Sequence, residues 1–369
     1  EAMLVALSAS GNPSSVHREG RAARRVVEDA RTAVAELVGG AAENVVFTSG
    51  ATEAANTLLT PQWTLGRGSL TLSHLYVCEA DHPCLLSGGR FAPSQVTRIG
   101  VDGNGLLRLD ALEAALAAHD WEAGLPLVAL HLANNESGVI QPARRIAELV
   151  KAVGGVLVLD AVQAAGRIQV DLSQGVGDFV ILSAHKIGGP AGIGAFVGAS
   201  GLMMPQPLVR GGGHERGHRA GTENLAGIAG FGAAARHAVA ALARVGDVRS
   251  LRDRLEAAIR SIAPDAVVHG SAAQRLPNTV FFSLPGLKAE TAQIAFDLAG
   301  IALSAGSACS SGKVGPSHVL KAMGIGSGED GLRVSIGETT TEAEIDHFAE
   351  TLRALVTRRP TGTGVASAA

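Results

Sequence analysis

An alternation of strand-like and helix-like segments is the feature that most constrains the fold of this chain. Short apolar runs at 44–48, 70–78, 127–132, 156–160, 179–182 and 195–197 have the length and composition of buried strands. Segments with helical spacing of apolar residues lie between them, at 16–38, 52–59, 110–118 and 144–153. This order predicts an α/β fold with a mostly parallel sheet.

The rhythm changes near residue 244, which predicts a second domain. Helices are expected at 248–262 and 289–298, and strands at 266–269, 278–283 and 332–336. A last helix is expected after Thr341, because Thr341 and Glu344 have capping-box spacing. We therefore predict a large domain over 1–243, a small α+β C-terminal domain over 244–359 and a disordered tail over 360–369.

The composition excludes several classes of function. The net charge is −3, from 31 basic and 34 acidic residues, and the chain has one Tyr and two Trp. We therefore expect no nucleic-acid partner and no membrane association. The most apolar helix candidate, 225–245, is interrupted by Arg236, His237 and Arg244, so no membrane span is expected. Three cysteines make no disulfide framework, which favours a reducing cytoplasm.

Lys186 is the first candidate for chemistry. It directly follows the apolar run 179–182, at the carboxyl end of a predicted strand, where open α/β sheets bind ligands. The glycines in 188–194 allow a bound group to approach the backbone closely. A lysine in suitable surroundings forms a Schiff base, although most lysines are simply solvated.

Asp160 is the second candidate, because it ends the apolar run 156–159. A carboxylate buried there requires a cation, and a protonated pyridine nitrogen would supply one. The alternative is an ordinary helix N-cap.

The segment 48–53, Thr-Ser-Gly-Ala-Thr-Glu, predicts an anion site at a helix start. Simple N-capping by Thr52 or Ser49 is an equal alternative. The segment is not a P-loop, because no Gly-Lys-Ser/Thr follows it, so a nucleotide enzyme is disfavoured.

Cys309 lies in 304–312, Ser-Ala-Gly-Ser-Ala-Cys-Ser-Ser-Gly, a run of small and polar residues. This composition predicts an exposed loop and a candidate nucleophile, against the alternative of an incidental thiol.

A metal site is not expected. His74, Cys78, His82 and Cys84 lie within eleven residues, but their spacing matches no zinc-finger pattern and would not converge on a strand.

Together these motifs resemble the cysteine desulfurases, a branch of the class V aminotransferases with pyridoxal 5′-phosphate (PLP) fold type I. The resemblance covers nearly the whole chain and rests on five segments in the family's order. They include 11–17 (GNPSSVH), 183–186 (SAHK), 211–224 (GGGHERGHRAGTEN) and the Cys309 segment 304–312. It implies a large domain built on a mostly parallel seven-stranded sheet.

The resemblance also implies a role for each site residue. Lys186 would carry PLP, Asp160 would pair with its ring nitrogen, and Gln163 would reach its phenolic oxygen. His82 would stack on the ring and exchange protons. The phosphate would be held by Ala51, Thr52, Ser183 and His185, and by Thr222 of the partner subunit. Asn135 and Arg333 would bind the substrate carboxylate, with Asn135 also near the cofactor, and Cys309 would take the sulfur.

The function implied is a cytoplasmic homodimeric enzyme that converts L-cysteine to L-alanine and forms a persulfide on Cys309. The sulfur would serve iron–sulfur cluster assembly or another biosynthesis through an acceptor or scaffold protein. The alternatives are a selenocysteine lyase, another class V aminotransferase, or a non-catalytic assembly scaffold. Where the family has Arg after 336–337, this chain has Glu338, which reverses a charge.

Overall fold

The chain forms two compact units in a computed structural model, which describes residues 1–8, 11–306, 317–326 and 330–359. The large unit comprises 1–101, 106–134 and 140–243. The small unit comprises the chain from Arg244 onward together with two short segments, 102–105 and 135–139. The main division thus falls between Ala243 and Arg244, and Asn135 belongs to the small unit.

The large unit is built on a sheet of nine strands in the described part of the chain, in the order β1-β8-β7-β6-β5-β3-β2-β9, with β4 also paired to β3. Strands β4, β3, β5, β6 and β7 are neighbours in parallel, whereas β8, β1, β2 and β9 join antiparallel. Without the β2 and β9 extension, seven strands remain, which confirms the predicted fold class. The strands are β1 (Val45–Thr48), β2 (Gln62–Leu65), β3 (Gly68–Cys78), β4 (Val96–Ile99), β5 (Leu125–His131), β6 (Val156–Asp160), β7 (Phe179–Ser183), β8 (Gly194–Gly198) and β9 (Met203–Pro205).

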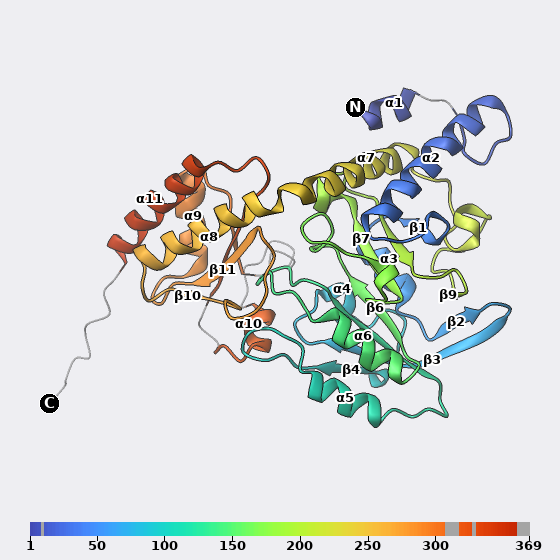
Figure 1. Cartoon of the computed structure of the whole chain (residues 1–369), viewed down its shortest axis with the longest axis horizontal. Coiled ribbons are helices and arrows are strands. Elements are labelled where there is room, and N and C mark those ends of the chain that lie inside the picture. Colours follow the sequence, from blue (N-terminus) through green and yellow to red (C-terminus); the bar gives the residue numbers. More distant parts are fainter. Residues whose placement is uncertain (9–10, 307–316, 327–329, 360–369) are drawn as a thin grey trace. The chain divides into compact units, whose positions relative to one another are not determined.

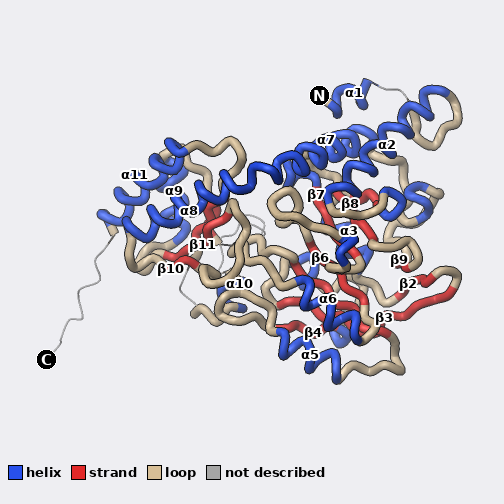
Figure 2. Tube along the Cα trace, in the orientation of Figure 1, coloured by secondary structure: helices blue, strands red, loops and turns tan. Residues whose placement is uncertain are grey.

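Helices cover the strands of this sheet (Figure 2). In Figure 1, α2 and α7 run alongside each other. Gly232 allows their close approach, because a Cβ there would lie 2.6 Å from the backbone of Ala30. The central core combines β-branched and aromatic side chains, among them Trp63, Phe179 and Phe196. The helices are α1 (Ala2–Ser8), α2 (Arg18–Leu37), α3 (Ala51–Leu58), α4 (Pro83–Leu86), α5 (Leu109–Ala117), α6 (Ala143–Ala152) and α7 (Leu225–Ala241).

The small unit has a sheet of the order β10-β11-β13-β12, with all pairings antiparallel. Its core includes the stacked rings of Phe296 and Phe348, with centroids 4.9 Å apart. Thr341 and Glu344 form the predicted capping box of α11. The elements are α8 (Val245–Ile262), β10 (Val267–Val268), β11 (Thr279–Ser283), α9 (Ala289–Leu298), β12 (Ser304–Ala305), α10 (His318–Ala322), β13 (Leu332–Ser335) and α11 (Glu342–Arg358).

The strands and helices predicted from the apolar pattern are all present, and most of their ends lie within three residues of the predicted ones. Sequence reasoning missed β2, β4 and β9, which are three or four residues long. The side chains of β2 are largely exposed, so its sequence gives no continuous apolar signal.

One continuous helical run, Leu225–Ile262, passes a test of length and hydropathy for a membrane span. Its most apolar window is 56% buried inside the protein, as in the core helix of a soluble protein. This is weak evidence for a span.

Candidate active site

Lys186 lies directly after β7, in a short 3₁₀ turn, Ala184–Ile187. Gly188 ends the turn in the left-handed region, at φ 84°, which a side chain would disfavour. The Lys186 side chain is half-buried. Arg167 fixes the backbone here, because its two terminal nitrogens donate to the carbonyls of Lys186 (2.9 Å) and Gln163 (3.0 Å). The lysine turn and the segment after β6 are therefore held at a set spacing.

Asp160 ends β6 and pairs in register with Ile181 of β7, five residues before Lys186. Its Oδ1 accepts the backbone N–H of Val162 at 2.9 Å, so it caps a tight turn instead of a helix. Burial raises its pKa from 3.8 to about 6, opposed by the Val162 N–H and by the charge of Lys186. The carboxylate thus lacks a full cationic partner within the large unit, although it lies beside a lysine.

Ser183 and His185 lie on either side of this turn's first residue. The Ser183 hydroxyl and His185 Nδ1 are 2.9 Å apart. The pKa of His185 is lowered by partial burial and by the charge of Lys186. A neutral imidazole and a hydroxyl joined in this way use one of their two protons in the bond they share, so one proton is left to donate to an anion.

The start of α3 lies next to this turn. Thr48 of β1 and Ser183 of β7 both pair in register with Gly194 of β8. A Cβ on Gly194 would lie 2.7 Å from the backbone of Gly50 and from the carbonyl of Leu182. The absence of a side chain therefore lets the helix start approach the lysine strand.

The predicted N-cap alternatives at this helix are both wrong. Gly50 is the N-cap of α3, and it makes no side-chain cap. Thr48 donates instead to the Gly50 carbonyl, and Thr52 is exposed. The start of α3 thus has no capping side chain, as an anion site requires.

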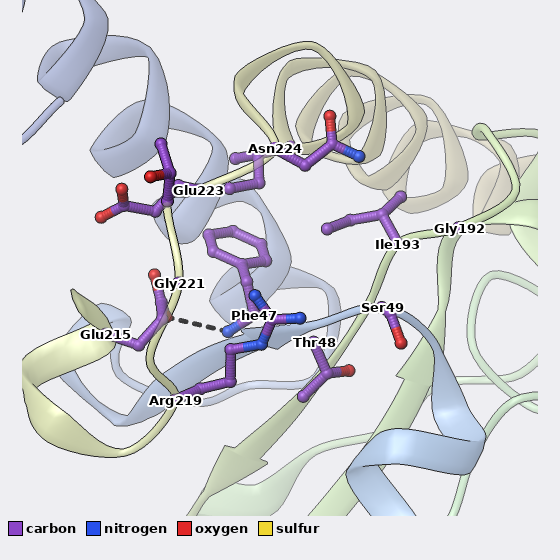
Figure 3. Close-up of a pocket in the computed structure, with 12 residues that line it drawn as sticks. Phe47, Thr48, Ser49, Gly192, Ile193, Glu215, Arg219, Gly221, Glu223 and Asn224 are labelled. Atoms are coloured by element: carbon purple, nitrogen blue, oxygen red, sulfur yellow. Dashed lines mark hydrogen bonds between the residues drawn. The ribbon is translucent and has the colours of Figure 1, made fainter. Parts of the chain in front are cut away.

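A pocket of about 280 Å³ lies beside this helix start, and Figure 3 shows its walls. Thr48 and Ser49 form one side, and Thr222 lies in the segment that forms the other. Arg219, also in this wall, pairs with Glu53 of α3 at 2.9 Å. The Gly-rich segment 211–224 is therefore attached to the helix that carries Thr52.

A buried ion pair holds the same segment, and sequence reasoning missed it. The two terminal nitrogens of Arg31 donate to Glu215 at 2.8 and 2.9 Å. Glu215 also accepts the backbone N–H of Phe47 (Figure 3), and the Arg31 guanidinium lies over the Phe47 ring. Glu215 and Arg216 have left-handed φ values of 46° and 56°, which are uncommon for residues other than glycine.

His82 caps α4, where its Nδ1 accepts the backbone N–H of Cys84 at 3.2 Å. This bond fixes the orientation of the half-buried imidazole. Cys84 and Cys78 are both buried and in no disulfide. Burial, and then the charge of Asp81, raise the pKa of the Cys78 thiol well above its ordinary value.

Arg333 and Asn135 lie together in the small unit. Arg333, on β13, donates from one terminal nitrogen to the Asn135 carbonyl (2.5 Å) and from the other to the Ser304 hydroxyl (3.0 Å). The structure thus brings together two residues 198 positions apart in the sequence. Glu338, the charge reversal noted in the sequence, pairs with Arg244 at 2.6 Å.

Cys309 lies outside the described residues, as does the tail 360–369. The described neighbour of the cysteine loop is Ser304, which pairs in register with Arg333. The predictions for the loop and for the tail remain predictions.

One trio of potential metal ligands lies close together among the described residues. Single atoms of Cys78, Asp81 and His131 are within 4.8 Å of one another, and all three residues are buried. This trio differs from the four residues weighed in the sequence, of which it contains only Cys78.

Comparison with known proteins identifies the class. The sequence profile described as Aminotransferase class-V matches residues 3–348. A solved structure of a NifS-like protein from Rickettsia africae superposes with a TM-score of 0.85 at 29% identity, covering 96% of this chain and 94% of that one. The chain belongs to the aminotransferase class-V family.

Within this family the similar relatives are cysteine desulfurases. One from Cereibacter sphaeroides is 40% identical and covers 96% of this chain and 91% of the relative. Cysteine desulfurase IscS 1 of Archaeoglobus fulgidus is 35% identical, over 97% of this chain and 93% of the relative. The structure of SspA in complex with cysteine superposes with a TM-score of 0.71 at 25% identity, covering 91% of this chain and 95% of that chain.

Proposed function

We propose that this enzyme is a PLP-dependent cysteine desulfurase, which converts L-cysteine to L-alanine and passes the sulfur to Cys309. The relatives at 35–40% identity support the reaction. The cofactor is inferred from the site, and the persulfide from the sequence around Cys309.

The observation that carries the cofactor assignment is the environment of Asp160. A buried carboxylate whose pKa is raised to about 6 gains most from a cationic partner, and a pyridinium nitrogen is one. Lys186, the amine that would hold the cofactor, follows the neighbouring strand. The residues present therefore fit PLP.

Other groups of the large unit would hold the rest of the cofactor. The uncapped start of α3, with Ala51 and Thr52, and the Ser183–His185 pair fit a phosphate. Gln163 follows Asp160 by three residues and would reach the phenolic oxygen. The His82 ring, held by the Cys84 amide, would lie against the cofactor ring. When bound, PLP supplies an electron sink that acidifies the substrate α-carbon.

Arg333 would bind the carboxylate of cysteine. Its guanidinium is braced by two neutral oxygens, from Asn135 and Ser304. A planar guanidinium so braced presents a fork that matches a carboxylate. The Asn135 amide side chain would complete this contact.

Sulfur transfer to Cys309 balances without an external oxidant. The Cys309 thiolate attacks the substrate sulfur, the Cβ–S bond breaks and an S–S bond forms. The electron pair and a proton go to Cβ, so the substrate is reduced to alanine while the two sulfurs are oxidised to a persulfide. An external thiol then releases the sulfur.

The test combines cofactor mapping with a product assay. We expect borohydride followed by mass spectrometry to place PLP on Lys186, and L-cysteine to yield alanine and, with a reductant, sulfide. Cys309→Ser is expected to bind cysteine without forming persulfide or alanine. An adduct on another lysine would refute the cofactor site. Turnover of selenocysteine alone would favour a lyase, and formation of 3-mercaptopyruvate from L-cysteine would favour a transaminase.

We further propose a homodimer in the cytoplasm, with Thr222 of the partner subunit at the phosphate. The supports are the attachment of the segment 211–224 to α3 and the two buried thiols outside any disulfide. Light scattering tests the dimer: a fully active monomer would contradict it. The sulfur acceptor is expected to be a scaffold or carrier protein.

A further inference from the structure

A buried acid–imidazole pair lies near Asp160 and has no role in the reaction proposed above. Asp81 follows β3 and is 0% exposed, and His131 ends β5 and is 4% exposed. Their Oδ1 and Nδ1 atoms are 2.6 Å apart. Asp81 also accepts two backbone N–H groups, those of His131 and Cys78, each at 2.8 Å. Both carboxylate oxygens are thus engaged, Oδ1 by His131 and Oδ2 by the Cys78 amide.

Gln141 fixes the tautomer of the imidazole. Its Oε1 accepts the backbone N–H of Leu107 at 2.9 Å, so its amide nitrogen is the atom 3.0 Å from His131 Nε2. His131 Nε2 then accepts a hydrogen bond, and the ring proton is on Nδ1, facing Asp81. The Asp81 carboxylate therefore faces the Nδ1 proton, and of the two residues Asp81 has the larger electrostatic effect on Asp160.

This charge lies close to Asp160 because of the sheet register. His131 and Asp160 are partners on the neighbouring parallel strands β5 and β6. The groups that act on Asp160 have opposite signs: Asp81 raises its pKa, whereas His131 and Lys186 lower it. In a buried, low-dielectric setting such a charge is poorly screened.

We propose that Asp81 and His131 form a positioning pair, which holds a fixed negative charge behind Asp160 and so strengthens the binding of a cationic ring nitrogen. The inference rests on the proposed use of PLP. It assigns to these residues no contact with the cofactor or the substrate. The effect would act through Asp160, the residue that would face the ring nitrogen.

A metal ion held by Cys78, Asp81 and His131 is the competing interpretation of the same trio. An ion would have to displace the hydrogen bond between Asp81 and His131. It would also have to ionise a thiol whose pKa is raised by burial. The hydrogen bonds already in place favour the charged pair.

The experiment compares two ligands of the cofactor-free protein: PLP and 1-deazapyridoxal 5′-phosphate, in which a C–H replaces the ring nitrogen. Asp81→Asn is expected to weaken PLP binding about three- to tenfold, on the scale of up to one pKa unit, and to leave binding of the deaza compound unchanged. Equal weakening of both ligands, or of neither, would overturn the proposal.

Three further variants separate charge from structure. Asp81→Glu keeps the charge, so it should restore the preference for PLP over the deaza compound that Asp81→Asn loses. His131→Gln leaves the Asp81 charge in place, so the preference should be kept or increased; its loss would overturn the proposal even if Asp81→Asn does not fold. Asp178→Asn is the matched control, because Asp178 also accepts a strand N–H, that of Leu157, and should leave the preference unchanged.

Two other outcomes are decisive. If the wild-type protein binds neither ligand, the proposed function fails, and the inference fails with it. Stoichiometric metal in the purified protein that is lost in Asp81→Asn would replace the charged pair by a metal site.

Discussion

Glu215 and Asp160 are both buried acids of the large unit, 6% and 7% exposed, yet their surroundings differ. Glu215 receives two hydrogen bonds from Arg31 and one from a backbone amide. Asp160 receives a backbone amide from Val162, and burial raises its pKa to about 6. A carboxylate paired within the chain supports the fold. One that lacks a full partner remains ready for a cation brought by a ligand.

The largest effect should come from removing Arg31, the cation that pairs with the buried Glu215. Arg31→Met leaves Glu215 buried without its cation, so we expect a loss of about 3–5 kcal/mol in the free energy of unfolding. Arg24→Met on the same helix is the control, because Arg24 forms an exposed pair with Glu28 and should change stability by about 1 kcal/mol or less. Urea unfolding measures both, and similar values for the two variants would contradict the comparison.

Arg333 extends the comparison to a cation that would bind the carboxylate of the substrate. Arg333→Ala should lower kcat/KM for cysteine, mainly through a higher KM, because a charge-assisted contact is lost. The loss of binding free energy should be about 2–5 kcal/mol. PLP should remain bound, as its absorbance would show. Arg254→Ala, which removes exposed ion pairs in the same unit, is the control. An unchanged KM would remove Arg333 from the site.

Removing the charge of Asp160 should raise the free energy of unfolding, whereas removing the cation that pairs with Glu215 should lower it. In the cofactor-free protein its folded pKa, about 6, exceeds the ordinary 3.8. Folding therefore favours the protonated acid. This contribution to the free energy of unfolding is fully present below pH 3.8 and is lost as the pH rises through about 6. Asp160→Asn should be more stable than wild type by about 3 kcal/mol at pH 8, with the difference vanishing near pH 4. A constant difference across this range would refute the assignment.

The smallest effects are expected at the two buried thiols. Cys78→Ser and Cys84→Ser should retain kcat/KM within about threefold, since a buried neutral thiol is inert. Persulfide trapping with an alkylating reagent, followed by mass spectrometry, gives the site of sulfur. Label found mainly on Cys84 would contradict the role of Cys309.

The sequence predicted those parts of the site that depend on local pattern. Lys186 and Asp160 each follow an apolar run, so strand ends could be located without knowing which strands are neighbours. The role of Arg333 came only from the resemblance, because nothing near it in the sequence indicates Asn135. The structure supplies that contact across 198 positions.

The contacts that the sequence did not reveal are long-range pairs of polar residues. Arg31 and Glu215 are 184 positions apart, and Asp81 and His131 are 50 apart. One signal was available: Arg31 interrupts the apolar face of α2, between Val27 and Val34, and a charge buried there requires a partner. Which acid would supply it depends on the left-handed turn at Glu215, which no local propensity indicates.

Gly194 has a consequence for how this protein tolerates mutation. A methyl group there would occupy the gap between β8 and the start of α3, within 2.7 Å of two backbone segments. In a library of all single substitutions, position 194 should therefore tolerate no replacement, although its side chain performs no chemistry. A genetic selection for sulfur transfer would therefore identify Gly194 as an essential residue. A purely chemical description of the site would leave it out.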